Sequence, residues 1–175
     1  MKDTYSIQNT TSVNGIFIIL VFASHLRSYI TLSPFANNFL TYLGQLMVTT
    51  FFLFSGYGIF LSIEKKGMTY LNQFPRKRIL SVLLSFDACV LIYQLLTVVL
   101  HKPYPISVRL LAFTGWTNVG NSNWYIFVIL ILYLITWISF KLSKQKPLSS
   151  LILTSILCYA FLIILSFVKE NYWYN

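Results

Sequence analysis

The sequence has very few acidic side chains. Only 4 of its 175 residues are Asp or Glu, against 13 Lys and Arg, which gives a formal net charge of +9 at pH 7. All charged residues together make up only 10% of the chain, whereas 57% is hydrophobic. A soluble domain of ordinary composition carries about a quarter charged residues, so the composition excludes that class. With a mean hydropathy of +0.69, the chain is expected to be an integral membrane protein.

Cysteine is also scarce, since the chain has only 2. Cys89 and Cys158 both lie in apolar stretches and have no paired or metal-like spacing, so we interpret them as small buried hydrophobic residues. The sequence therefore predicts no metal site. The basic excess is found mainly in short connections between apolar stretches, where it is typical of a topology signal. For that reason we expect no nucleic-acid partner.

Long apolar runs are what the sequence does contain. Each is about long enough to cross a hydrocarbon core of about 30 Å as a helix that rises about 1.5 Å per residue. The five predicted spans cover residues 13–30, 40–63, 79–100, 124–140 and 148–168. Residues 1–12 and 169–175 are then short tails. The predicted fold is all-α, a polytopic transmembrane helix bundle.

The basic residues predict the orientation of these spans, because cytoplasmic connections carry an excess of Lys and Arg. Nine such residues lie on the side of the N-terminus: Lys2, Lys65, Lys66, Arg76, Lys77, Arg78, Lys141, Lys144 and Lys146. Four lie on the other side: Arg27, Lys102, Arg109 and Lys169. We therefore expect a multi-pass protein of the cell membrane with a cytoplasmic N-terminus and an external C-terminus.

His25 and Asp87 stand inside predicted spans. An ionisable side chain at membrane depth is costly and is therefore a functional-site hypothesis. His25 lies in the outer half of the first span, about three helical turns after Asn14 and on the same face of the helix. Asp87 is near the middle of the third span, where a carboxyl group needs a partner or a proton.

Several stretches, taken in their order and spacing, resemble the acyltransferase 3 family of bacterial integral-membrane O-acyltransferases. They are the run from Gly15 to His25, Phe51-Phe-Leu-Phe-Ser-Gly-Tyr57, Phe74-Pro-Arg-Lys-Arg-Ile79, and the run from Asn123 to Tyr133. The resemblance covers about residues 13–135. Because the family spans the membrane about ten times, the chain is similar to its N-terminal half.

The resemblance implies transfer of an acyl group, usually acetyl, from acyl-CoA to a hydroxyl of a carbohydrate or lipid-linked glycan at the outer face. The implied reaction is O-acetylation of a polysaccharide by an enzyme embedded in the lipid bilayer. Acyl-CoA is the donor substrate, and no separate cofactor is implied. The family's first helix carries a basic residue, ten intervening residues and a histidine. His25 fills the histidine position, but Asn14 fills the basic one, and an amide can form hydrogen bonds without supplying a positive charge.

Roles for the remaining residues follow from the same resemblance. His25 would be the catalytic base, and the alternative is a neutral histidine bonded across helices. Arg76 and Arg78 match arginines that begin the family's third helix and would hold CoA phosphates, or serve only as a topology signal. Trp124 and Tyr125 would shape an acceptor entrance or belong to an aromatic belt. Structural roles are expected for Ser55, Gly56, Tyr57 and Asp87: the first three in helix packing, Asp87 in pairing with a basic residue.

A second hypothesis is a truncated, non-catalytic membrane protein derived from this family, or one that needs a second copy or a partner chain. Asn14 and the small number of spans favour it. A third, a small transporter or channel subunit, would require repeats or paired broken helices, and the sequence has no such signal.

Overall fold

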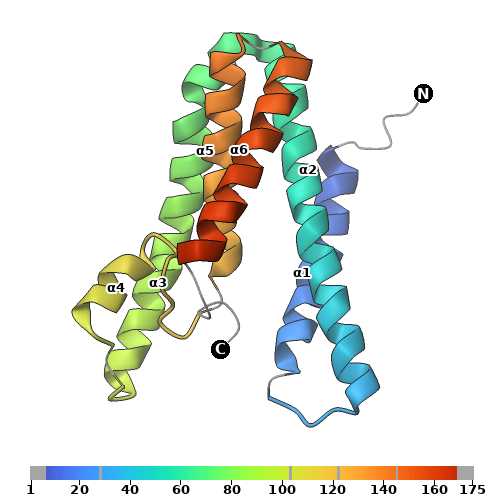
Figure 1. Cartoon of the computed structure of the whole chain (residues 1–175). Helices are drawn as coiled ribbons and strands as arrows, with labels where there is room; N and C mark the ends of the chain where they lie inside the picture. Colours follow the sequence, from blue (N-terminus) through green and yellow to red (C-terminus); the bar gives the residue numbers. More distant parts are fainter. Residues whose placement is uncertain (1–6, 28, 103, 122, 145, 169–175) are drawn as a thin grey trace. The chain divides into compact units, whose positions relative to one another are not determined.

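A computed structural model describes residues 7–27, 29–102, 104–121, 123–144 and 146–168, and all regular structure in these ranges is helical. The helices are α1 (Ile7–Leu26), α2 (Pro34–Phe74), α3 (Ser81–Val99), α4 (Ile106–Ala112), α5 (Trp124–Leu142) and α6 (Pro147–Val168) (Figure 1). A π-helical turn, η1 (Pro75–Leu80), joins α2 to α3. The all-α prediction is confirmed.

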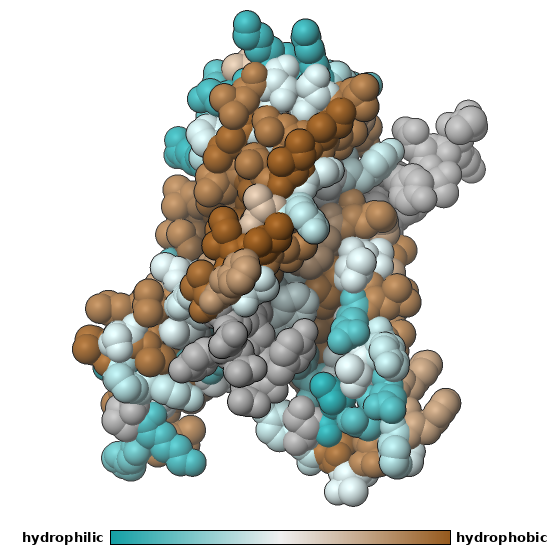
Figure 2. Space-filling model, in the orientation of Figure 1, coloured by the Kyte–Doolittle hydropathy of each residue, from teal (hydrophilic) through white to brown (hydrophobic). Residues whose placement is uncertain are grey.

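Three helical stretches are long and apolar enough to cross a membrane: Pro34–Val99, Trp124–Leu142 and Pro147–Val168. The first contains two of the predicted spans, 40–63 and 79–100, within one nearly continuous helical stretch. The apolar part of α1, Ser12–Leu26, is shorter, and α1 ends before the predicted boundary at residue 30. Figure 2 shows hydrophobic side chains along α6 and hydrophilic ones where α5 and α6 are joined.

The chain divides into two compact units, which are described separately: Met1–Leu61, here called the N-terminal hairpin, and Ser62–Asn175, here called the C-terminal bundle. In the hairpin, α1 runs beside the first part of α2, and a short turn connects them (Figure 1). The Phe17 ring lies 6.4 Å from the Phe54 ring, stacked, and 6.0 Å from the Phe51 ring, edge-on. Aromatic packing of this kind holds the two helices together where lipid removes the hydrophobic driving force.

Ser24 of α1 and Gly44 of α2 lie in close contact within the hairpin. Ser24 is buried, and its hydroxyl donates a hydrogen bond to the Val21 carbonyl at 2.7 Å. A Cβ atom built on Gly44 would lie 2.4 Å from the Ser24 Oγ and 2.8 Å from its Cβ. Only glycine therefore fits at position 44, because small residues let helix backbones approach closely in a membrane.

In the C-terminal bundle, the helical stretch breaks at Gly67, whose backbone angles of φ 53° and ψ −136° are suited to glycine. The residues after Gly67 form the turn that sequence analysis treated as a basic connection, and they are helical. Leu71 and Phe74 in this turn are fully buried. The Phe74 ring packs edge-on against the Tyr133 ring of α5 at 5.9 Å. The turn is therefore part of the bundle's core.

One hydrogen bond explains how a proline is tolerated in this turn. Pro75 has no backbone N–H, so the carbonyl of Leu71, four residues earlier, loses its helical donor. The indole Nε1–H of Trp137 donates to that carbonyl at 2.9 Å. The bond thus satisfies a buried acceptor and ties the turn to α5, whose core residues Ile129, Tyr133 and Ile135 are buried.

We expect Gly44→Ala to destabilise the hairpin, because the added methyl group would overlap the Ser24 side chain. Overpacking of this kind costs about 1–3 kcal/mol. Thermal unfolding in detergent measures the effect, and Gly56→Ala is the matched control, because a Cβ at Gly56 meets nothing within 4 Å. Adding Ser24→Gly should restore stability. Equal effects of the two glycine variants would contradict this account of the helix contact.

We expect Trp137→Phe to lower the free energy of unfolding by about 1–3 kcal/mol, because the buried Leu71 carbonyl loses its donor. In a Pro75→Ala background the residue at 75 has an N–H, so the same substitution should cost less. A double-mutant cycle measured by chemical denaturation in detergent reports this coupling. Strictly additive effects would show that the indole does not replace the missing amide.

Candidate functional site

The end of α1 carries the predicted catalytic histidine. His25 lies in the last turn of α1, and its side chain is exposed. On one side of it Ser24 packs against Gly44. On the other side, Nη1 of Arg27 donates a hydrogen bond to Oδ1 of Asn37 in α2 at 3.3 Å. These two contacts fix the end of α1 against α2, so the imidazole projects from an anchored backbone.

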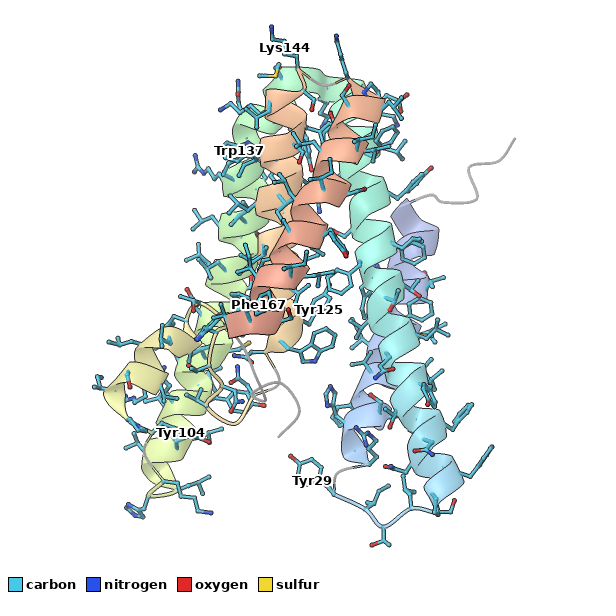
Figure 3. The ribbon with its side chains drawn as sticks, in the orientation of Figure 1. Tyr29, Tyr104, Tyr125, Trp137, Lys144 and Phe167 are labelled. Carbon is cyan, nitrogen blue, oxygen red and sulfur yellow. The ribbon has the colours of Figure 1, made fainter. Side chains whose placement is uncertain are left out.

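The turn that follows α1 marks this end of the hairpin, and Tyr29 shows its place in Figure 3. Tyr29 is highly exposed, as is Phe35 at the start of α2. An imidazole at this position can approach a hydroxyl group without displacing another side chain of the hairpin. The arrangement is suited to proton transfer with a bound molecule.

Asn14 is on the same helix but is far from His25. Eleven residues at about 1.5 Å each separate them by about 16 Å along the axis, so the two side chains cannot act on the same atom. Asn14 Oδ1 is buried and has no hydrogen-bond partner among the described residues. A buried acceptor without a donor is uncommon in proteins and marks Asn14 as a position where a ligand donor would be stabilising.

The two predicted donor-binding arginines differ in their surroundings. Arg78 is half-buried, and its Nε donates to the Tyr70 hydroxyl at 3.0 Å. The Tyr70 ring in turn packs edge-on against Phe74 at 5.7 Å. Arg76 and Lys77 are exposed. Arg78 is therefore tied to the core of the turn, whereas Arg76 presents its guanidinium group to the surroundings.

Trp124 and Tyr125 form the first turn of α5, at the end of the bundle opposite η1. Their rings lie 6.4 Å apart, edge to face. Just before them, the buried Asn123 side chain donates a hydrogen bond to the Thr117 carbonyl, which anchors the preceding loop. Figure 3 shows Tyr125 at this end of α5 and Lys144 at the other. The geometry fits both roles predicted for the pair, an acceptor entrance and an aromatic belt.

The predicted packing residues lie on α2 and α3. Gly56 is exposed, and no atom would contact a Cβ built there, so its small size is not required for packing within the described residues. Gly44 has that role in the hairpin, and no sequence pattern distinguishes it from the other glycines of α2. Asp87 is half-buried, and its Oδ1 has no hydrogen-bond partner in the described part of the chain. The basic partner predicted for Asp87 remains a prediction.

The described residues contain two histidines, His25 and His101, and two cysteines, Cys89 and Cys158. No group of three or more His, Cys, Asp or Glu side chains lies close enough to hold a metal ion there.

Comparison with known proteins identifies the family of the chain. A family model described as an acyltransferase domain, that of the acyltransferase 3 family, matches residues 12–175. No curated protein and no solved structure matches the chain. The match extends through the stretches that carry the resemblance and on to the end of α6. The chain therefore belongs to the acyltransferase 3 family of membrane acyltransferases.

Proposed function

We propose that this protein is a membrane O-acyltransferase. It transfers an acyl group from acyl-CoA to a hydroxyl of a cell-surface or secreted glycan, and the proposed acyl group is acetyl. The observation that carries the proposal is the exposed His25, held at the end of α1 by the Ser24–Gly44 contact and the Arg27–Asn37 hydrogen bond. Membership of the acyltransferase family supports acyl transfer as the reaction class.

The proposed step needs one base and one leaving group. A ring nitrogen of neutral His25 accepts the proton of the acceptor hydroxyl while the hydroxyl oxygen attacks the thioester carbonyl carbon. The new C–O bond forms, the C–S bond breaks, and the CoA sulfur leaves with its electron pair. The imidazolium then returns the proton to that sulfur. The products are an O-acyl glycan and free CoA, and the step requires no oxidant or reductant.

The donor and the acceptor would use different groups. Arg76 and Lys77 are exposed cations on the turn between α2 and α3, and guanidinium groups match phosphate geometry well. They are the proposed contacts for CoA phosphates, with Arg78 positioning the turn through Tyr70. Trp124 and Tyr125 are the proposed aromatic contacts for the glycan. The topology predicted from the basic residues places the donor in the cytoplasm and the acceptor outside.

A non-catalytic protein, or one that acts only with a second copy or a partner chain, is the second candidate. Two observations favour it. Asn14 supplies no positive charge where the resemblance implies a basic residue, and its amide oxygen has no partner among the described residues. In addition, none of the most apolar window of α6 is buried by the described residues, so that helix can pack against lipid or against another chain.

We expect His25→Ala to reduce acyl transfer by at least about a hundredfold, the usual contribution of a positioned general base. The assay incubates the purified chain in nanodiscs with radiolabelled acetyl-CoA and a membrane-glycan extract. Gln45→Ala, which alters an exposed polar residue of the same hairpin, is the control and should keep full activity. Unchanged incorporation by folded His25→Ala would exclude the histidine as base. A folded wild-type protein that is inactive with several acyl donors would favour the second candidate.

A further inference from the structure

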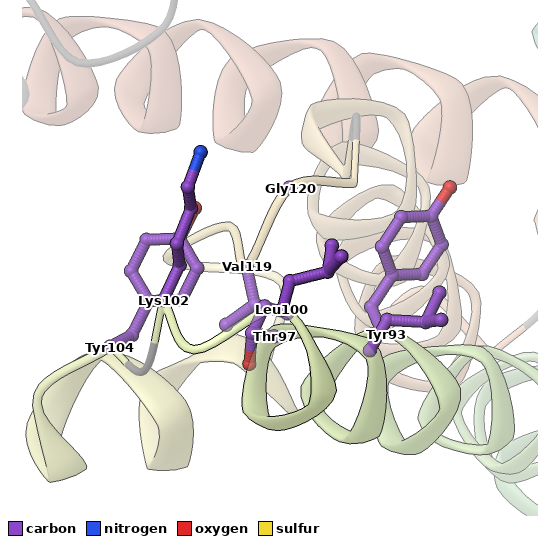
Figure 4. Close-up of a pocket in the computed structure, with 8 residues that line it drawn as sticks. Tyr93, Thr97, Leu100, Lys102, Tyr104, Val119 and Gly120 are labelled. Carbon is purple, nitrogen blue, oxygen red and sulfur yellow. The ribbon is translucent and has the colours of Figure 1, made fainter.

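A groove of about 460 Å³ lies at the end of α3 that is farther from η1 (Figure 4). Four residues of α3 and its cap form one wall: Tyr93, Leu96, Thr97 and Leu100. Their spacing of three, four and seven residues from Tyr93 places them on one face of the helix. The loop at Val119 and Gly120 forms the opposite wall.

Lys102 and Tyr104 complete the groove at one end, and Tyr93 lies at the other (Figure 4). The end of α3 determines where Lys102 lies. His101 adopts a left-handed conformation with φ 53°, and its amide donates to the Val98 carbonyl at 3.1 Å. The Lys102 amide donates to the Thr97 carbonyl at 2.9 Å. This pair of bonds is a Schellman-type cap, normally made with glycine, and it turns Lys102 back over the groove. A non-glycine residue in this conformation is strained, and such strain clusters at ligand sites.

The groove has a positive charge, and no described residue supplies an acidic partner for it. Residues 100–123 contain no Asp or Glu, and the only acidic residues in the described part of the chain are Glu64 and Asp87. The other strong cation of this segment, Arg109, is engaged through its Nε with the Gln94 amide oxygen at 3.4 Å. Among the described residues that line the groove, Lys102 therefore supplies the cation for a bound anion.

Most of the groove surface is apolar. The exposed side chains of Leu96 and Leu100 supply aliphatic surface, and the rings of Tyr93 and Tyr104 are both partly exposed at the ends of the groove. The Thr97 hydroxyl donates to the Gln94 carbonyl at 2.8 Å, so its hydrogen is not available to a ligand. A small inorganic anion would leave these walls uncovered. The complementary molecule has an anionic head and a hydrocarbon part.

The position along α3 fits such a molecule. From Ser81 to Leu100 the helix rises about 30 Å, which is the thickness of a hydrocarbon core. With α3 spanning the hydrocarbon core, Lys102 would lie at headgroup level on the side away from the basic turn. Tyr93, about 10 Å before Leu100 along the helix, would lie within the hydrocarbon layer.

We propose that this groove binds a lipid phosphate, with the phosphate on the Lys102 ammonium and the first part of the hydrocarbon chain along the α3 face between Tyr104 and Tyr93. Two sources present this chemistry. One is an anionic phospholipid of the bilayer, and the other is the phosphate-bearing carrier of a lipid-linked glycan acceptor. Only the second source rests on the proposed acyl transfer.

The test measures lipid binding to the purified full chain by native mass spectrometry from detergent, without an acyl donor. The probes are phosphatidylglycerol, a long-chain prenyl phosphate, phosphatidylcholine and inorganic phosphate. We expect the wild-type protein to bind the two anionic lipids, phosphatidylglycerol and the prenyl phosphate, about tenfold more tightly than the zwitterionic phosphatidylcholine. Lys102→Gln should abolish that preference, and Tyr93→Ala should weaken binding. Lys146→Gln, an exposed lysine at the other end of the bundle, should leave the preference unchanged.

Preferential binding of the prenyl phosphate over phosphatidylglycerol would assign the groove to the acceptor carrier, and equal binding would assign it to bilayer lipid. The proposal is overturned if the wild-type protein has no preference, if inorganic phosphate displaces the lipid, or if Lys146→Gln loses as much as Lys102→Gln. Circular dichroism confirms that each variant is folded. A preserved lipid preference in a protein without acyl transfer would count against the proposed function alone.

Discussion

The hydrogen bond from the Trp137 indole to the Leu71 carbonyl is the constraint on which the C-terminal bundle depends. Inside a membrane protein each backbone polar group must be satisfied by the protein itself, because the hydrocarbon core offers no water. Pro75 removes one backbone donor at the place where the chain turns from α2 to α3. The indole restores that donor from α5, and Phe74 packs on Tyr133 beside it. The reversal of the chain and the docking of α5 are thus one arrangement, and it leaves Arg76 and Lys77 exposed on the turn.

The two helices of the N-terminal hairpin are held together by contacts of a different kind. Close contact between Gly44 and Ser24 brings α1 against α2, and the Arg27–Asn37 hydrogen bond closes the end of the pair. Both contacts flank His25. A base on a fixed helix end loses little freedom when a substrate binds, which favours proton transfer in a fixed geometry. The packing of small residues in this hairpin therefore has a direct consequence for the chemistry proposed at its end.

Much of the fold could be predicted from the sequence because apolar runs and basic connections follow from the thickness and polarity of a bilayer. The all-α class is predicted in this way, and the structure confirms it. The role of the turn after Gly67 was not predicted, because the residue that satisfies the Leu71 carbonyl is 66 positions farther along the chain. No local pattern connects Trp137 to Pro75.

The candidate site could be predicted only in part, for the same reason. His25 and the basic turn could be identified from residue type and order. The difference between Arg78 and Arg76 depends on which of them reaches the Tyr70 hydroxyl, and spacing alone does not determine this. Gly44 could not be distinguished from the other glycines of α2 without the position of Ser24. The groove beside Lys102 depends on the left-handed backbone at His101, which a non-glycine residue rarely adopts.

We propose that this chain transfers an acyl group from a donor on one side of a membrane to a glycan acceptor on the other side. Sealed vesicles that contain the protein in one orientation, with labelled acyl-CoA on one side and glycan on the other, test it most directly. We predict that label reaches the glycan only when the donor is on the side of the basic turn at Arg76. Transfer that occurs only when donor and glycan share one side would contradict the account.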